Sequence, residues 1–321
     1  MQKVRRATTI YFLIQGIAVF AWWAGLYIDP HIREWFVLDT NYTTSLLAFV
    51  LADLSFLGIG SMVAAWLVHT RSDLDRIAAW TVTGAMSYAA VYSFTYALMS
   101  DRGWLGVILM IPAMIWCGVF AVGLTFGGHM FRASRDGSSG WIIAKTFMQI
   151  VVLWSIILGV IPYLLMLVEN KLGVEPLSLP YHALIGTAAF ILISCVGLWA
   201  GYVMSKFGRG TPLPLDHANH LVIRGPYKYV RNPMAVSGIG QGLAVALILG
   251  SPLTVLYALM GSLIWQLIFR PLEEDDLEVR FGTAFREYRK NVRCWIPRLT
   301  AYQMEGTADS SNSIDSPFGK M

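Results

Sequence analysis

The chain has 321 residues, of which 56% are hydrophobic and only 14% are charged. Soluble domains are usually nearer half apolar and a quarter charged, so this composition excludes an ordinary soluble protein and indicates a membrane protein. The formal net charge of +4 is modest, and the sequence resembles no nucleic-acid-binding module, so we expect no nucleic-acid partner.

Six apolar segments follow one another from the N-terminus, each long enough, at about 20 residues, to cross a ~30 Å hydrocarbon core as a helix. They run over 8–28, 44–69, 77–99, 105–126, 141–168 and 183–204. Two shorter runs, 234–250 and 252–269, are separated only by the turn signal Gly250-Ser251-Pro252 and predict a tight helical hairpin. The predicted fold is an all-α polytopic membrane protein with about eight transmembrane helices and a C-terminal hairpin.

The positions of Lys and Arg predict the orientation of these spans, because cytoplasmic loops are enriched in both. Of the 24 Lys and Arg residues, only Arg33, Arg102 and Lys171 fall in loops on one side, and Lys145 lies within a span. All the others fall on the opposite side. We therefore expect both termini to be cytoplasmic. The protein is expected in a plasma or inner membrane.

The predicted spans and the charge divide the chain into three parts. Residues 1–204 hold six spans to which no role can be assigned, 205–299 hold most of the charge around the hairpin, and 300–321 are polar and without periodicity. The last part is expected to be disordered. Because a hairpin returns its ends to the same side, the basic segments 205–233 and 270–299 are expected to meet.

These two basic segments carry the motifs. The first contains 221-LVIRGPYKYVRNPM-234, and the second reads 270-RPLEEDDLEVRFGTAFREYRKNVRCWIPRL-299. In this order, around a hairpin, they resemble the C-terminal core of the isoprenylcysteine carboxyl methyltransferase and phospholipid N-methyltransferase superfamily, which are integral-membrane enzymes. The resemblance covers about 205–299. It implies an S-adenosylmethionine-dependent methyltransferase whose partners are membrane lipids and a lipophilic or membrane-accessible small acceptor, either a carboxylate, a thiol or an amine.

The implied cofactor has an amino group, a carboxylate, a sulfonium, a ribose and an adenine, so its site needs carboxylates, a cation and aromatic or backbone surfaces. By resemblance, Glu273 and Glu274 hold the ammonium or the ribose hydroxyls, although the pair can instead mark the helix end. Arg231 is expected to bind the cofactor's carboxylate bidentately, although interfacial anchoring also accounts for cations here. The other candidate cofactor-binding residues are Gly225, Pro226, Tyr227, Tyr229, Asn232, Pro233 and Gly238.

Several of these candidates have alternative interpretations. Tyr227 and Tyr229 suit adenine stacking or cation–π contact, and equally suit an ordinary interfacial belt. In 237-SGIGQG-242, the glycines Gly238 and Gly242 favour close helix packing first and cofactor contact second. No strand precedes this segment, so it does not indicate a phosphate-binding loop.

Arg231 and Asn232 are the candidate catalytic residues. Many members of the superfamily have His at the position of Asn232 and Tyr at that of Ala235. An asparagine can orient a cofactor or substrate by hydrogen bonding, but it cannot accept a proton as a general base. The nature of the methyl acceptor therefore stays open, as does the oligomeric state.

Asp53, in the middle of the second span, supports a rival interpretation as a transporter or channel, because intramembrane carboxylates are often functional. It lies outside the recognisable core, so we expect it to satisfy polar groups between helices rather than to take part in methyl transfer. Another rival is an NADPH-dependent, sterol-reductase-like enzyme on a related helical core. His217 and His220 have HxxH spacing but no nearby carboxylates at ligand spacing, so no metal site is expected.

Overall fold

The computed structural model describes residues 1–34, 36, 43–128, 130, 138–211 and 218–303, and all regular secondary structure in these ranges is helical. The chain packs as two units. Unit 1 comprises Met1–Met130 and Leu263–Glu273, and unit 2 comprises Phe131–Ser262 and Glu274–Met321. These units are defined by how the helices pack. The boundary predicted between residues 204 and 205 instead separates six spans without an assigned role from the expected methyltransferase core, and it stays a prediction.

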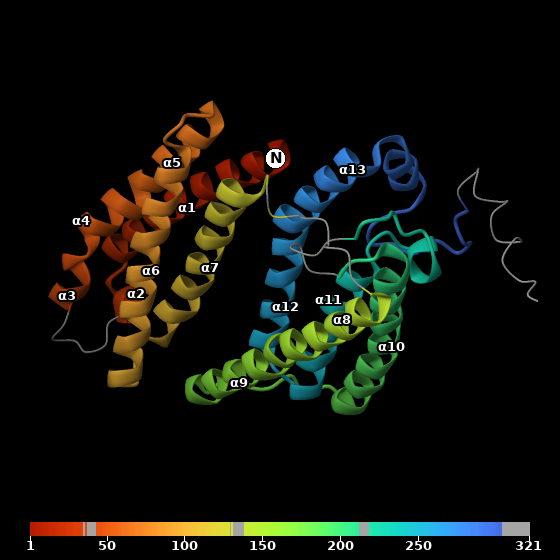
Figure 1. Cartoon of the computed structure of the whole chain (residues 1–321). Helices are drawn as coiled ribbons and strands as arrows, with labels where there is room; N and C mark the ends of the chain where they lie inside the picture. Colours follow the sequence, from red (N-terminus) through yellow and green to blue (C-terminus); the bar gives the residue numbers. More distant parts are fainter. Residues whose placement is uncertain (35, 37–42, 129, 131–137, 212–217, 304–321) are drawn as a thin grey trace, which may run out of the picture. The chain divides into compact units, whose positions relative to one another are not determined.

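The long helices of unit 1, α1, α5, α6 and α7, lie alongside one another (Figure 1). A π-helical turn, η2, leads into α5, and a second one, η6, packs against α1 and α7. The elements are α1 (Gln2–Ile28), α2 (Pro30–Glu34), α3 (Thr43–Ala48), α4 (Val50–Ala52), η2 (Asp53–Ile59), α5 (Gly60–Thr70), α6 (Asp75–Ser100), α7 (Trp104–Phe126) and η6 (Trp265–Phe269).

The core of unit 1 is apolar with a few internally satisfied polar groups. Phe12 and Phe120 are among its fully buried side chains. Gln15 on α1 donates to the Ser61 hydroxyl on α5 over 3.0 Å. Small residues and short polar side chains that bond across helices are typical of packing inside a membrane, where the hydrophobic effect does not drive helices together.

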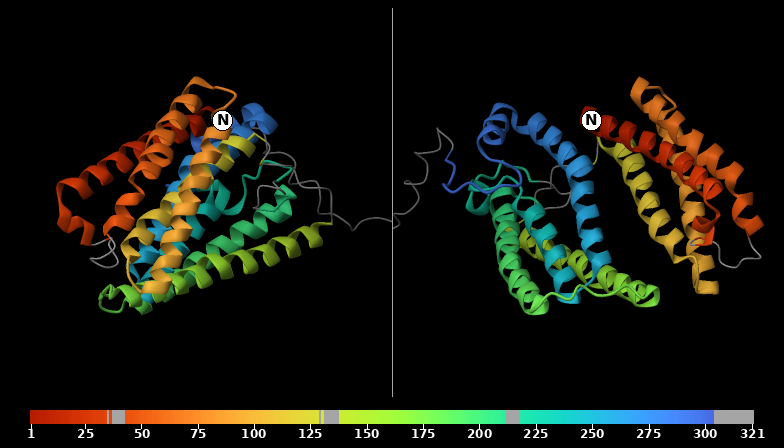
Figure 2. Two further views of the ribbon diagram at one scale, coloured as in Figure 1. Left: turned by 90° about the vertical axis from the view of Figure 1, so that its left-hand side faces the viewer. Right: turned by 180° about the vertical axis from the view of Figure 1, so that it is seen from behind.

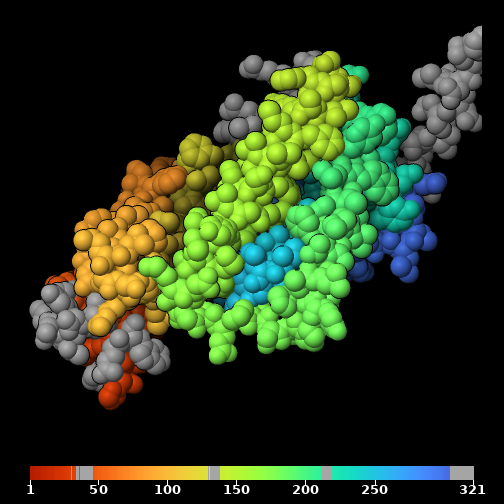
Figure 3. Space-filling view, turned by 90° about the horizontal axis from the view of Figure 1, so that it is seen from below, coloured from red at the N-terminus to blue at the C-terminus, as the bar shows by residue number. Residues whose placement is uncertain are grey.

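Unit 2 is built from the remaining helices. The rod formed by α8, the π-helical turn η3 and α9 runs beside α10, and α12 is visible between them in Figure 3. The elements are α8 (Ser139–Trp154), η3 (Ser155–Val160), α9 (Ile161–Leu172), α10 (His182–Gly208), the 3-10 turn η5 (Gly225–Lys228), α11 (Pro233–Leu249), α12 (Pro252–Ile264) and α13 (Arg270–Asn291). Helix α13 begins in unit 1 and continues into unit 2.

The predicted hairpin between α11 and α12 is confirmed. Gly250 has a φ of 62°, a left-handed conformation that glycine adopts without steric cost. The Gly250 amide donates to the Leu247 carbonyl and the Ser251 amide to the Ala246 carbonyl, which together terminate α11. The Ser251 hydroxyl then accepts from the Thr254 amide over 3.0 Å and caps α12. The turn is therefore determined by its own residues.

Six helices of the described chain are long and apolar enough to cross a membrane: Gln2–Ile28, Leu46–Thr70, Trp104–Phe126, Ser139–Leu172, His182–Gly208 and Pro252–Asn291. Helix α11 is shorter but also apolar, and α6 is not among the six. The all-α, polytopic fold class is thus confirmed. The count of eight spans stays a prediction.

The segment after the hairpin differs from the sequence expectation in one respect. Helix runs on from α12 through η6 into α13, so the basic segment is largely helical up to Asn291. A break occurs at Gly282, where φ is 51° and ψ is −123°. Disorder of residues 300–321 stays a prediction, and within them Tyr302 is buried among Phe285, Tyr288 and Val292. The rest of the predicted tail, 304–321, lies outside the described residues.

Candidate active site

The two basic segments meet, as the sequence predicted. The Arg231 amide donates to the Arg293 carbonyl over 2.9 Å, and the Arg298 amide donates to the Tyr229 carbonyl over 2.9 Å. A third backbone bond of 3.0 Å joins the Tyr302 amide to the Lys228 carbonyl. Figure 1 and the right-hand view of Figure 2 show the loop 218–232 and the last turns of α13 together at one end of α10 and α11.

The turn at Gly225 requires glycine for two reasons. Its φ is 53°, and a Cβ there would lie 3.0 Å from Val203 and 3.4 Å from Trp199 on α10. Pro226 follows at the second position of the 3-10 turn and is buried, as is Pro233 at the start of α11. These residues set the path of the loop against α10.

Arg231 occupies the centre of the site. One terminal guanidinium nitrogen donates to Oε1 of Glu274 over 2.6 Å, and the other donates to the carbonyls of Arg289 at 3.0 Å and Val292 at 2.9 Å. The side chains of Arg231 and Glu274 are only 8% and 7% exposed. The carbonyls belong to the end of α13 and its continuation, where the helix dipole favours a cation. Arg231 therefore ties the loop before the hairpin to both ends of the α13 segment of unit 2.

Glu273 and Glu274 differ in burial although they are adjacent. Glu274 is buried against Arg231, and Glu273 is half-buried. Neighbours in a helix point roughly 100° apart, so the two carboxylates leave the helix in different directions. The sequence singled out Arg231 and the acidic pair separately, and the structure brings Arg231 and Glu274 into direct contact.

The two tyrosines of the loop also differ. Tyr227 is 4% exposed and packs in an apolar cluster with Ala200, Val203 and Val222, and its carbonyl accepts from the Tyr288 hydroxyl over 2.6 Å. Tyr229 is 38% exposed. The geometry favours Tyr229 over Tyr227 as an aromatic surface for a ligand, and cofactor contact by either remains a prediction.

Asn232 begins α11. Its side-chain oxygen accepts from the Ala235 amide over 3.1 Å, which makes it the N-cap of the helix, and Pro233 follows at the first helical position. This capping role is a local reason for asparagine at the position. It holds the Asn232 side chain between the loop and the hairpin.

The glycines of α11 serve packing to different degrees. A Cβ at Gly242 would lie 3.2 Å from that of Ala258 on α12, which is a close approach inside the hairpin. A Cβ at Gly238 would meet only Trp154 at an ordinary 3.6 Å. Packing thus explains Gly242 better than Gly238, whose predicted cofactor contact stays a prediction.

Two polar groups near these residues were missed by sequence reasoning. Gln241, buried one turn after Ser237, accepts from the Trp154 indole over 2.6 Å and donates to the Ser194 hydroxyl over 2.8 Å. The sequence feature that could have pointed to Gln241 is that it is a single glutamine within an apolar helix. The buried hydroxyl of Tyr288 could not be singled out, because its partner is a backbone carbonyl distant in sequence.

Metal ligands do not gather in the described part of the chain, where no group of three His, Cys, Asp or Glu side chains is suitably placed. His220 is exposed, and His217 lies outside the described residues.

Residues 181–284 match the model of the phospholipid methyltransferase family. This region is similar to that family, and we call it the phospholipid methyltransferase region. The phospholipid methyltransferase region begins at α10, earlier than the resemblance in the sequence, and includes the loop, the hairpin and the acidic pair. All the candidate site residues from Gly225 to Glu274 therefore lie inside it, in a chain with six apolar helices of spanning length, which supports a membrane methyltransferase of this type. Searches of curated proteins and of solved structures gave no match.

Proposed function

We propose that the protein transfers a methyl group from S-adenosylmethionine to a lipophilic or membrane-accessible small acceptor that carries a carboxylate, thiol or amine. The observation that carries the proposal is the joining of the loop 224–233 to the α13 segment through Arg231 and Glu274, inside the phospholipid methyltransferase region. The match speaks for methyl transfer, and the use of this particular donor is our inference.

The residues of the site fit the chemistry of this donor. Glu273 and Glu274 are carboxylates that suit an ammonium or ribose hydroxyls, and Arg231 has a guanidinium that suits a carboxylate. The exposed ring of Tyr229 suits a flat base or a sulfonium. When bound, S-adenosylmethionine supplies an electrophilic methyl group.

The protein groups would contribute mainly by positioning and by excluding water. The buried Arg231–Glu274 pair holds the loop against α13, and Asn232 anchors the start of the hairpin. An asparagine amide cannot take up a proton, so an acceptor that must lose one would need another base. A carboxylate acceptor would need none.

Calorimetric titration of the purified protein tests the donor. We expect S-adenosylmethionine and S-adenosylhomocysteine to bind and NADPH not to bind. Transfer of label from S-adenosylmethionine to a lipid extract would then identify the class of acceptor. Binding of NADPH alone would favour the reductase-like alternative, and binding of none of the three would favour a transporter or channel.

We also propose that both termini are cytoplasmic, in line with the distribution of Lys and Arg. In a variant without its native cysteines, a single cysteine at Asn170 should react only from outside, and one at Gln303 only from the cytoplasmic side. Both positions are exposed in the structure. Labelling of the two from the same side would contradict the eight-span topology.

A further inference from the structure

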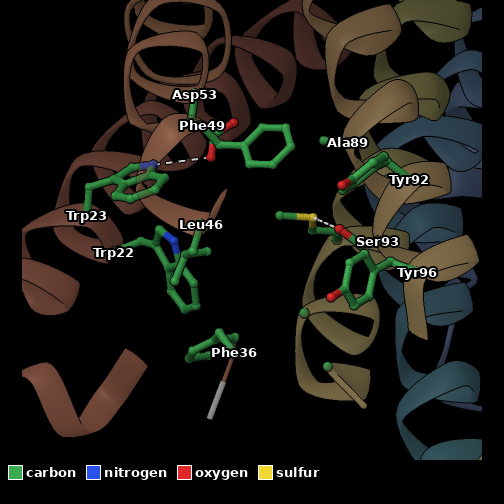
Figure 4. Close-up of a pocket in the computed structure, with 13 residues that line it drawn as sticks. Trp22, Trp23, Phe36, Leu46, Phe49, Asp53, Ala89, Tyr92, Ser93 and Tyr96 are labelled. Carbon is green, nitrogen blue, oxygen red and sulfur yellow. Dashed lines mark hydrogen bonds between the residues drawn. The ribbon is translucent and has the colours of Figure 1, made fainter. Parts of the chain in front are cut away.

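Unit 1 contains a pocket of about 410 Å³, a size in the usual range for small-molecule sites. One wall comes from α1 and the segment 46–53, and the facing wall comes from α6 and α7 (Figure 4). Aromatic side chains dominate the lining on both walls. They are Trp22, Trp23, Phe36, Phe49, Tyr92 and Tyr96.

Asp53 is the only charged residue among the described residues that line the pocket. It lies at the start of the π-helical turn η2, and π-helical turns are frequent at functional sites. Its side chain accepts one hydrogen bond from the described residues, over 3.2 Å from the buried Trp23 indole (Figure 4). That bond spans two helices, in line with the role that the sequence predicted for Asp53.

A carboxylate inside a spanning segment is costly unless a cation or several donors balance it. The hydrogen bond from Trp23 comes from a neutral group, so it offsets only a small part of the cost of placing the Asp53 carboxylate there. Arg33, which follows α1, is engaged elsewhere, because its guanidinium lies 5.6 Å from the centre of the Tyr27 ring and donates to the Leu26 carbonyl. The charge of the pocket is therefore complementary to a positively charged ligand.

The aromatic rings add a second attraction for such a ligand. The rings of Phe49 and Tyr92 come from opposite walls and contact each other, with centroids 5.4 Å apart, and Tyr96 continues the row from Tyr92 at 6.3 Å. Ring faces attract organic cations, and a cage of them is a common means of recognising quaternary ammonium groups. We propose that this pocket binds an organic ammonium ion with apolar substituents, with Asp53 as its counter-ion.

The pocket is lined by residues of unit 1, whereas Arg231 and Glu274 belong to unit 2, and the proposal does not rest on methyl transfer. Within unit 1, the start of α1 lies beside Gly127 and Leu272, the neighbour of Glu273, because a Cβ at Gly127 would contact Met1 and Leu272. Trp22 is near the other end of α1. At 1.5 Å per residue, Met1 and Trp22 are roughly 30 Å apart along that helix.

The first test uses the parent protein in a maltoside detergent and probes that share one alkyl chain. Hexyltrimethylammonium should bind at least about tenfold more tightly than hexanol or hexanesulfonate in calorimetric titrations. Dihexanoyl-phosphatidylcholine, compared with dihexanoyl-phosphatidylglycerol, shows whether lipid head groups are included. Binding of the phosphatidylcholine, a zwitterion that carries the same trimethylammonium group, would include lipid head groups. Binding of hexyltrimethylammonium alone would restrict the site to free amphiphilic ammonium ions. Equal binding of the cation and hexanol would overturn the proposal.

Two substitutions locate the binding. Asp53→Asn keeps an oxygen that can accept from Trp23, and it should weaken hexyltrimethylammonium about tenfold or more without changing hexanol binding. Phe49→Leu removes one ring face and should weaken the cation about threefold to tenfold. Its matched control is Phe56→Leu on the same span, where the ring is exposed and outside the pocket. Unchanged cation binding in Asp53→Asn, or equal effects of the two Phe substitutions, would contradict the assignment.

Discussion

Glu274→Gln is expected to lower the free energy of unfolding by about 3–5 kcal/mol, because it leaves a buried Arg231 without its counter-charge. The glutamine keeps the shape and can still accept from Arg231, so the effect reports the charge and not a lost contact. Both side chains are nearly inaccessible, at 8% and 7% exposure, so solvent cannot replace the missing carboxylate. Denaturant unfolding of the detergent-solubilised protein, followed by circular dichroism, measures the change.

Glu278→Gln is the matched control on the same helix. Glu278 pairs with Arg289 at 2.8 Å and with Arg286 at 3.6 Å, but these side chains are 32–53% exposed. Partly exposed pairs contribute little, so its loss should cost less than about 1 kcal/mol. In a double-mutant cycle, Arg231→Met and Glu274→Gln should be coupled by about 1–3 kcal/mol. Additive effects, or a Glu274→Gln variant as stable as the parent, would show that the pair does not join the two segments.

Glu273→Gln is expected to weaken S-adenosylhomocysteine binding roughly tenfold to hundredfold while leaving unfolding close to that of the parent. Glu273 is half-buried and leaves the helix about 100° from the direction of Glu274, so its substitution does not break the buried Arg231–Glu274 pair. Arg231→Lys should weaken binding to a similar degree, because an ammonium cannot reproduce the planar fork of the guanidinium. Calorimetric titration of each variant measures the affinity.

Measuring both the affinity for S-adenosylhomocysteine and the free energy of unfolding distinguishes a structural role from a cofactor-binding role for Glu273 and Glu274. If Glu274 is mainly structural, its substitution lowers both quantities, whereas a cofactor role for Glu273 alters affinity alone. Glu278→Gln should bind S-adenosylhomocysteine like the parent. If Glu273→Gln also binds like the parent, Glu273 does not hold the cofactor, and the acidic pair is a structural feature of the helix.

Much of the fold could be predicted from the sequence because the deciding interactions are local. Apolar runs of spanning length form the helices, and Gly250, Ser251 and Pro252 terminate one helix and begin the next with their own backbone and hydroxyl groups. The meeting of the two basic segments followed from the hairpin, since its ends must return to one side. The motifs of the loop pointed to the region that the phospholipid methyltransferase model matches.

Only the tertiary structure decided which side chains face one another. Arg231 and Glu274 are 43 residues apart, and their contact depends on how the loop 218–232 crosses the end of α13. The same path buries Tyr227 and exposes Tyr229, although both look alike in sequence. The pocket around Asp53 likewise needs rings from several helices. Local periodicity determines that a helix forms and which residues share a face, but the rotation and pairing of helices arise from packing over the whole bundle.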